Sequence, residues 1–288
     1  MTITPEQFTS RMKAKNLPSL PLTVVALGEA VQDERCTVDR ILGILSKDPS
    51  LSATLLRLAN SALYAGEGSV MDLRSAVLRL GFDAMANLST GAAVIKNLRG
   101  GTHLDAVKLW QHSVAVGLTA KGICILAKRH GQAETAFLTG LLHDIGKIAL
   151  DTCFPEDYTV VLQKVADGAF FVDAEREALG MDHAEAGALL AATWSFPPAI
   201  VEVIRAHHEP GPQDFLPNLI HMSDLLVRTR IPMGPADEHL MISFDDLPAF
   251  KAVLAGALHK DLDVERMTFS IDDEVDHALA FVEVAFQA

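Results

Sequence analysis

Cysteine is scarce in this chain of 288 residues. Cys36, Cys124 and Cys153 are odd in number, lie far apart and form no Cys-x-x-Cys pair. Disulfide frameworks and cysteine metal sites both need paired or closely spaced cysteines. The sequence therefore indicates a reduced, cytoplasmic protein without a cysteine-based metal site.

Long apolar runs and a targeting pattern are also missing. Hydrophobic residues make up 49% of the chain, yet no apolar run reaches the roughly 18 residues that a membrane-spanning helix needs. Residues 1–6 show no basic stretch followed by an apolar one, so we expect no signal peptide. These absences predict a protein without a membrane segment.

Positive charge is in short supply, and the shortage lies in one half of the chain. The formal net charge is −13. Residues 1–140 carry 15 Lys and Arg against 11 Asp and Glu, whereas residues 141–288 carry 9 against 26. Nucleic-acid binding depends on Lys and Arg that neutralise phosphates, so we expect no nucleic-acid partner. Phosphate substrates are repelled as well, unless metal ions reverse the local charge.

The alternation of apolar and polar residues that is typical of strands is not evident, and helix signals recur in its place. Thr4, Pro5 and Gln7 form a capping box at the start of a first helix. Asp182 is the expected cap of a later helix that begins at His183. Apolar residues repeat at helical spacing through most of the chain. The sequence therefore predicts an all-α protein.

The most informative stretch is L-L-H-D-I-G-K at residues 141–147, inside a helix predicted from about residue 134 to 153. Burying His143 and Asp144 side by side is costly unless something compensates, and a metal ion does so by binding a neutral imidazole and a carboxylate. The alternative is a helix edge with two solvated polar residues. Lys147 follows Asp144 by three residues and shares its helix face.

Further polar residues occur where they can converge on this pair, namely His112, His183, His207, His208 and Asp224. For a lone histidine in the middle of an apolar helix, such as His112, a buried core position is the more common outcome. The remaining histidines lie in stretches that read as surface. Residues 231–248 contain proline, glycine and acidic clusters and predict a loop.

His112, the pair His143-Asp144 and Asp224 resemble the H…HD…D signature of the HD superfamily of metal-dependent phosphohydrolases. The N-terminal part resembles an HDOD domain, and the resemblance covers about residues 12 to 230. Four spaced motifs carry it: Leu17-Pro18-Ser19-Leu20-Pro21, Lys47-Asp48-Pro49-Ser50-Leu51, Leu58-Ala59-Asn60-Ser61 and Ala76-Val77-Leu78-Arg79-Leu80-Gly81.

The resemblance implies an all-helical bacterial signalling module. Many HDOD domains share the fold of the HD enzymes but have lost their catalytic residues, whereas this chain keeps the set. It also keeps the further ligands of the related HD-GYP phosphodiesterases, which have a histidine after the HD pair, a His-His pair and a later aspartate. His183, the pair His207-His208 and Asp224 match those positions in order.

Two departures from that pattern matter. After His208-Glu209 the chain continues as P-G-P-Q-D, where the HD-GYP segment continues to a Gly-Tyr-Pro. This difference argues against hydrolysis of cyclic-di-GMP. Lys108 lies four residues before His112, where some relatives have a glutamate that binds a third metal. The resemblance therefore implies two metals at most.

The implied cofactor is one or two divalent transition-metal ions such as Fe, Mn, Ni or Zn, which suit imidazole and carboxylate ligands. His112, His143 and Asp224 would hold the first ion, and His183, His207 and His208 would hold the second. Asp144 would bridge the two and, with Lys147, is the candidate catalytic residue. Lys147 would neutralise a phosphate oxygen; the alternative for it is a surface ion pair near a helix end.

Two functions follow from the resemblance. The first is a regulatory HDOD module of a two-component or cyclic-dinucleotide pathway that acts on a sensor kinase, a receiver or a cyclic-dinucleotide protein, with a bound metal. The alternative is a metal-dependent phosphohydrolase acting on a nucleotide or cyclic nucleotide. We expect a two-lobed bundle, with an N-terminal helical lobe at residues 1–100 and an HD-like helical domain at 101–230. An acidic helical extension at 231–288 would pack on the HD lobe.

Overall fold

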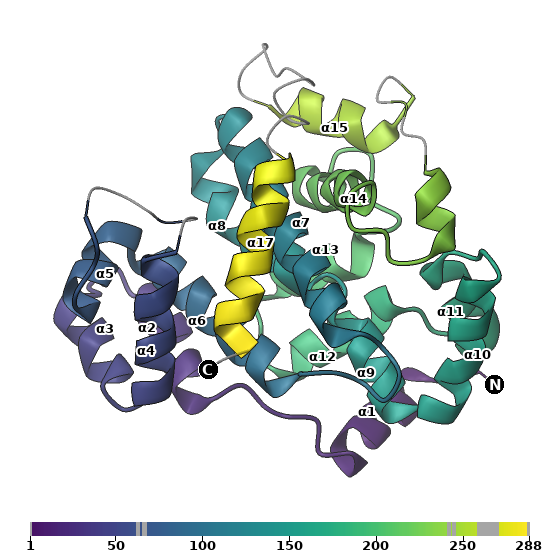
Figure 1. Ribbon diagram of the computed structural model, residues 1–288, viewed down its shortest axis with the longest axis horizontal. Coiled ribbons are helices and arrows are strands. Elements are labelled where there is room, and N and C mark those ends of the chain that lie inside the picture. Colours follow the sequence, from purple (N-terminus) through teal and green to yellow (C-terminus); the bar gives the residue numbers. More distant parts are fainter. Residues whose placement is uncertain are drawn as a thin grey trace. The chain divides into compact units, whose positions relative to one another are not determined.

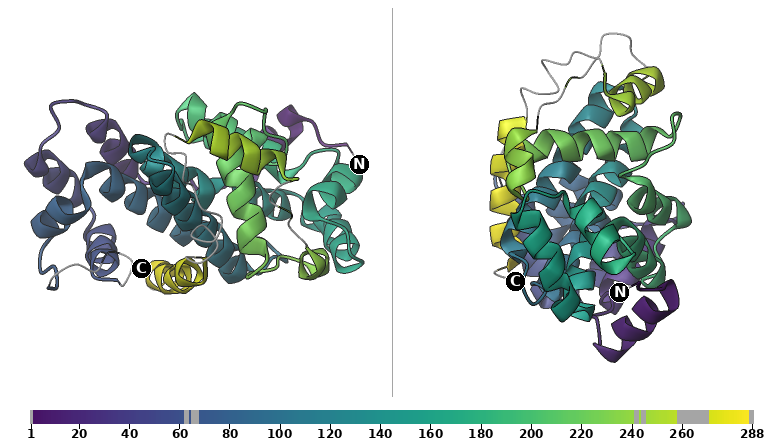
Figure 2. Two further views of the ribbon diagram at one scale, coloured as in Figure 1. Left: turned by 90° about the horizontal axis from the view of Figure 1, so that it is seen from above. Right: turned by 90° about the vertical axis from the view of Figure 1, so that its right-hand side faces the viewer.

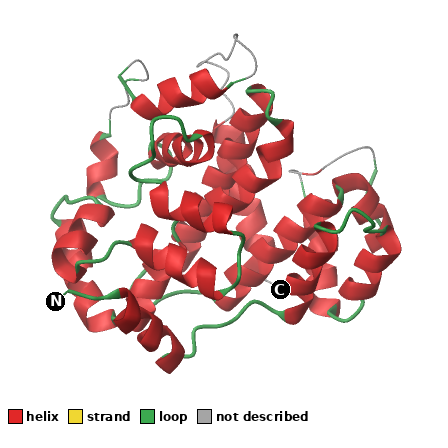
Figure 3. Cartoon of the chain, turned by 180° about the vertical axis from the view of Figure 1, so that it is seen from behind, coloured by secondary structure: helices red, strands yellow, loops and turns green. Residues whose placement is uncertain are grey.

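The computed structural model describes residues 2–61, 64, 68–240, 243, 246–257 and 271–286. Every regular element among these residues is helical, which confirms the predicted all-α fold (Figure 3). Within the same residues, no helix is both long enough and apolar enough to cross a membrane.

The chain divides into two compact units. The larger unit contains Met1–Leu17 and Gly100–Val275, and the smaller contains Pro18–Arg99 and Asp276–Ala288. Helix α17 (Ile271–Phe286) contributes residues to both. The predicted metal ligands all belong to the larger unit.

The larger unit begins with one short helix and continues after the smaller unit with most of its remaining helices (Figure 1). Its helices are α1 (Pro5–Ala14), α7 (Ala106–Leu126), η2 (His130–Gln132), α8 (Ala133–Leu142), α9 (Ile145–Cys153), α10 (Pro155–Ala166), α11 (Phe171–Leu179), α12 (His183–Thr193), α13 (Pro198–Ala206), α14 (Phe215–Arg228), η3 (Pro235–His239) and α15 (Pro248–Gly256).

Helices α7 and α8 pack closely together at the centre of the larger unit. A Cβ atom on Gly140 would lie 2.6 Å from the Cα of Gly117, so only glycine allows this approach. Helix α14 packs across α7, and α12 packs on α9 (Figures 1 and 2). Helices α7, α12 and α14 contain His112, His183 and Asp224, and the other candidate ligands lie at the ends of neighbouring helices.

The predicted helix starts are formed as the sequence indicates. The backbone N–H of Gln7 donates to the Thr4 hydroxyl, and the Gln7 side chain accepts from the Thr4 backbone, which completes the capping box of α1. The Asp182 carboxylate accepts from the backbone N–H of Glu185 at 2.9 Å and caps α12. This cap fixes His183 as the first residue of α12.

The smaller unit is a bundle of short helices with an apolar core. Leu27, Ile41, Leu55, Leu58 and Leu88 are among its fully buried side chains. Its helices are α2 (Leu22–Val31), α3 (Val38–Leu45), α4 (Pro49–Ala59), α5 (Leu73–Leu80) and α6 (Phe82–Asn97), together with the C-terminal part of α17.

Candidate metal centre

The His143-Asp144 pair lies at a break between two helices, so the prediction of one continuous helix through residues 134 to 153 was wrong. Helix α8 ends at Leu142 and α9 begins at Ile145. Gly146 allows the second helix to approach α12 closely. A Cβ atom there would lie 1.9 Å from the His183 carbonyl oxygen, so this glycine lets α9 lie directly against α12. The break presents both side chains of the pair to the interior.

One group of donor atoms comes from α7, α14 and the break. The Nε2 atom of His112 lies 2.9 Å from Oδ1 of Asp224 and 3.9 Å from Oδ2 of Asp144. The Nε2 atom of His143 lies 3.5 Å from Oδ2 of Asp144 and 3.7 Å from Oδ1 of Asp224. Bonds of about 2.1 Å in a tetrahedron place ligand atoms about 3.4 Å apart, so these separations fit one metal ion.

A second group lies beside the first. Ligand atoms of His183, His207 and His208 all fall within 4.8 Å of one another. The Nε2 atoms of His183 and His208 are 2.7 Å apart. His207 and His208 are neighbours at the C-terminal end of α13, and their ring centroids lie 4.0 Å apart. The structure therefore brings together every ligand that the sequence predicted, in two clusters.

Asp144 lies between the two groups. Its Oδ2 atom faces His112 and His143, while its Oδ1 atom lies 3.1 Å from Nε2 of His183. One carboxylate is thus shared by both clusters, as a bridging ligand requires. Its side chain is almost completely buried, so it does not lie on a solvated helix edge.

Backbone carbonyls orient two of the imidazoles. Nδ1 of His143 lies 2.7 Å from the Gly140 carbonyl oxygen, and Nδ1 of His207 lies 2.6 Å from that of Ile204. Each carbonyl accepts a hydrogen bond from Nδ1–H, which leaves Nε2 with a lone pair. Both Nε2 atoms are buried and have no hydrogen-bond partner among the described residues. Such unpaired buried acceptors are costly, and a metal ion would satisfy them.

His183 is oriented by a carboxylate that sequence reasoning missed. Glu175 is fully buried and accepts from both the backbone N–H and the Nδ1–H of His183. The Tyr158 hydroxyl donates to the other Glu175 oxygen at 2.8 Å. Glu175 lies on the same stripe of α11 as the buried Ala174 and Leu179. A charged residue on an apolar stripe is the sequence signal that could have identified it.

Burial and charge set the ionisation of these groups. Burial lowers the pKa of His207 to about 3 and holds that of His208 well below its usual value. Burial alone would lower the pKa of His183 too, but the Glu175 and Asp144 carboxylates together outweigh it and the pKa rises to about 9. A protonated His183 can donate from Nε2 to His208. A metal ion and this proton compete for the same lone pair.

The carboxylates remain ionised in spite of their burial. Burial would raise the pKa of Asp144, but His143, Lys147 and His183 hold it well below the usual range. Burial would likewise raise the pKa of Asp224, but its hydrogen bond from His112 and the nearby Arg228 hold it low. Both side chains are therefore available as anionic ligands at neutral pH.

His112 is held differently from the other histidines. Its Nε2 atom faces Asp224, while its buried Nδ1 atom has no hydrogen-bond partner among the described residues. Burial lowers the pKa of the ring, so His112 is neutral. To coordinate through Nε2, the ring would carry its proton on Nδ1, where none of the described residues accepts it. His112 would therefore need a change of tautomer before it could bind an ion through Nε2.

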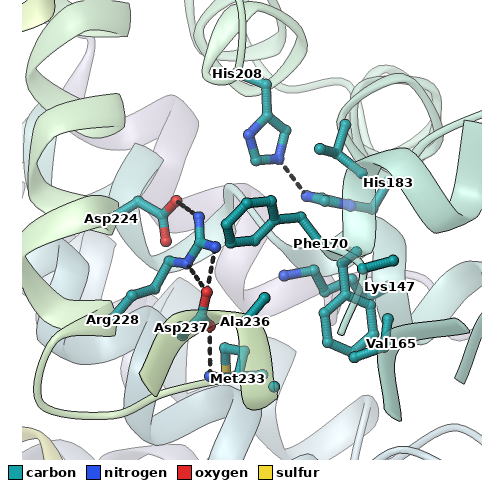
Figure 4. Close-up of a pocket in the computed structure, with 14 residues that line it drawn as sticks. Lys147, Val165, Phe170, His183, His208, Asp224, Arg228, Met233, Ala236 and Asp237 are labelled. Carbon is teal, nitrogen blue, oxygen red and sulfur yellow. Dashed lines mark hydrogen bonds and ion pairs between the residues drawn. The ribbon is translucent and has the colours of Figure 1, made fainter. Parts of the chain in front are cut away.

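Lys147 forms a buried ion pair, so a surface ion pair is not its role. Its Nζ donates to Oδ2 of Asp144 at 2.6 Å and lies 4.8 Å from the centroid of the Phe171 ring. Lys147 also lines a cavity of about 20 Å³ with His183, His208 and Asp224 (Figure 4). Arg228, four residues after Asp224 on α14, lines the same cavity. Two cations therefore line the same cavity as three of the candidate ligands.

A model of the HDOD domain matches residues 17–210 of the chain. The chain belongs to the HDOD family. The resemblance inferred from the spaced motifs is thereby confirmed, and the match includes every candidate ligand except Asp224. The family explains the helical architecture, while the ligand geometry described above is a property of this HDOD chain's own residues.

Solved structures share the fold over nearly the whole length of this HDOD chain. That of an HDOD domain protein of unknown function from Geobacter sulfurreducens has a TM-score of 0.82 at 24% identity and covers 98% of this chain and 99% of that one. That of a candidate phosphohydrolase from Shewanella amazonensis SB2B has a TM-score of 0.75 at 28% identity and covers 96% and 97%. Both likenesses support the same two-unit helical fold.

A curated relative is longer than this chain. An uncharacterized protein of Treponema pallidum (strain Nichols) is 26% identical over an alignment of 215 residues, which covers 70% of this chain and 40% of that protein. The HDOD chain thus spans less than half of that relative's length.

Proposed function

We propose that this chain is a bacterial signalling HDOD module organised around a centre for one or two divalent transition-metal ions. The convergence of the predicted ligands from α7, the α8–α9 break, α12, α13 and α14 carries the proposal. Ionised carboxylates and imidazoles suit Fe, Mn, Ni or Zn, and the ion would displace the proton on His183. Because the ligands come from separate helices, the free energy of metal binding would stabilise the fold of the larger unit.

The small cavity favours signalling over turnover. Its volume of about 20 Å³ leaves room for about one water molecule. A nucleotide does not fit beside the ligands in this arrangement. We therefore infer that the module's output passes through a protein partner, such as a sensor kinase, a receiver or a cyclic-dinucleotide protein. The metal centre would hold the helices in the conformation that the partner recognises.

Partner capture from the native host tests this function. The tagged chain is compared with a variant that carries His143→Ala and Asp144→Ala, and with a control that carries His130→Ala on the surface. We expect a signalling protein to co-purify with the wild type and the control and to be lost from the double variant. A partner set that is the same for all three proteins would contradict a metal-dependent output.

A metal-dependent phosphohydrolase acting on a nucleotide or cyclic nucleotide is the second candidate. The specific observation that favours it is the placement of Lys147 and Arg228, two cations that line the cavity beside the ligands. The likeness to the Shewanella amazonensis candidate phosphohydrolase supports it as well. A metal pair would supply Lewis acidity to phosphate oxygens. Lys147 would bind one of those oxygens once the metals take up the charge of Asp144.

Turnover of bis(p-nitrophenyl) phosphate with added Mn or Fe tests the second candidate. We expect Lys147→Gln to lower kcat by about 100-fold, the cost typical of losing one group that stabilises charge in the transition state. Lys164→Gln, at an exposed ion pair with Glu177, is the matched control and should leave kcat unchanged. Absence of turnover above that of the free metal would exclude this activity for the probe.

A further inference from the structure

Arg228, the last residue of α14, is packed against an aromatic ring and a candidate metal ligand. Its guanidinium lies 5.0 Å from the centroid of the Phe170 ring, and its Nη1 atom lies 3.6 Å from Oδ2 of Asp224. The side chain is only 15% exposed. An arginine packed in this way against an aromatic face and a candidate metal ligand is fixed in position, as recognition of an anion requires.

The group that Arg228 now binds is a carboxylate from another segment. Asp237, in η3, accepts from Nε of Arg228 at 2.8 Å and from Nη2 as well. The second Asp237 oxygen accepts from the backbone N–H of Met233 at 2.8 Å. Asp237 is itself buried, with 5% exposure, although it lies in a stretch that the sequence predicts to be a loop. A carboxylate and a phosphate present similar oxygen pairs to the arginine fork.

Arg228 lines one cavity with three of the candidate ligands, His183, His208 and Asp224. Figure 4 shows Arg228 between Asp224 and Asp237, with Phe170 against the guanidinium and with His183, His208 and Lys147 across the cavity. An anion that took the place of Asp237 on Arg228 would lie in the cavity that His183, His208 and Asp224 also line. The acidic balance of residues 141–288 makes this pair of cations the feature that could attract such an anion.

We propose that Arg228 is the binding residue for a phosphate group of a small-molecule ligand, and that Asp237 occupies its guanidinium until the ligand displaces it. The proposal rests on the metal centre of the proposed function, because the phosphate would lie beside those ligands. It explains how a cavity with room for one water can belong to a ligand-binding module. Displacing Asp237 both frees the guanidinium and enlarges the cavity. The same displacement would report ligand binding to a partner.

Calorimetric titration of the full chain with inorganic phosphate tests the proposal. Asp237→Asn removes the competing charge and keeps the side-chain shape, so phosphate should bind about tenfold more tightly or better than to the wild type. Arg228→Gln in the Asp237→Asn background should abolish that gain. Glu177→Gln, which breaks an exposed Lys–Glu pair with the same change in charge, is the matched control and should bind phosphate as the wild type does.

A second measurement needs no substitution. The Met233 amide donates to Asp237, so displacement of Asp237 by phosphate should speed hydrogen exchange at that amide in the wild-type chain. Equal phosphate affinity in the wild type and Asp237→Asn, or tight binding that survives Arg228→Gln, would overturn the proposal. An unchanged Met233 exchange rate at saturating phosphate would overturn it even if Asp237→Asn does not fold.

Metal content measured on the same samples separates this proposal from the proposed function. Bound metal without a gain in phosphate affinity would support the metal centre and contradict the Arg228 site. A gain in phosphate affinity without bound metal would support Arg228 as an anion site and contradict the metal centre.

Discussion

The two units of this chain bury different kinds of side chain. The larger unit buries charged and titratable groups, including Asp144, Lys147 and Glu175, whereas Thr54, Ser89 and Thr90 are the buried polar residues described in the smaller unit. Both units expose large apolar side chains, and the two most exposed of those described, Leu22 at 87% and Met71 at 80%, belong to the smaller unit. Buried charge costs stability unless it is paired. The contrast indicates that the chemistry of the molecule is confined to the larger unit.

Removal of metal should give the largest effect on stability, and it should affect the larger unit but not the smaller one. If metal is present at about a thousand times its Kd, stripping it lowers the free energy of unfolding by about 4 kcal/mol. The loss should appear in hydrogen exchange of α12 and α13 in the larger unit, and α2 and α4 in the smaller unit should keep their protection. Equal changes in both units, or none, would contradict the contrast.

A cavity in the smaller unit should give the next largest effect. Leu55 is fully buried in α4. Leu55→Ala should lower the free energy of unfolding of the smaller unit by about 2–5 kcal/mol, because it removes buried methyl groups and leaves a void. Chemical denaturation gives the stability, and elemental analysis should show unchanged metal content. A loss of metal in this variant would show that the centre depends on the smaller unit.

Loss of the Glu175 carboxylate, which accepts from His183, should give a smaller effect, and this effect should be on metal affinity. Glu175→Gln keeps the size of the side chain but weakens the hold on Nδ1–H, so metal affinity should fall by about 10- to 100-fold. Competition with a chromogenic chelator measures it. Glu177→Gln, exposed on the same helix, should not change the affinity. An unchanged affinity in Glu175→Gln would show that Glu175 serves only to fix α11.

An exposed leucine should give the smallest effect. Leu22 begins α2 and is almost fully solvated. Leu22→Ala should therefore change the free energy of unfolding by less than about 0.5 kcal/mol. The same chemical change at Leu55 serves as the buried counterpart. Similar losses of stability at the two positions would mean that the exposed side chains of the smaller unit are covered in solution.

Much of the fold follows from local signals in the sequence. Caps such as Thr4 and Asp182 act within one helical turn, so the structure forms them where the sequence places them. The break at His143 could not be predicted from local pattern, because residues on both sides favour helix. The close approach of Gly146 to the His183 carbonyl, which lies in a different helix, could not be predicted locally either.

The candidate site residues came from the resemblance to a family rather than from local helix signals. The ligand residues match a family pattern in order, and the structure brings all of them together. Glu175 and Asp237 belong to no such pattern. Glu175 binds His183 and Asp237 binds Arg228, and each partner lies in another segment that the local sequence does not indicate. The acidic residues around Asp237 read as a solvated surface until the fold buries one of them against Arg228.

Elemental analysis of the chain purified without chelator tests the metal centre most directly. The ligand geometry predicts about two equivalents of a transition metal, because two donor clusters share Asp144. His143→Ala and His183→Ala should lose that metal, while the surface variant His130→Ala should keep it. Less than about 0.2 equivalents in the wild type, unchanged after soaking in Mn or Fe, would contradict a metal centre and leave the clusters as a buried polar network.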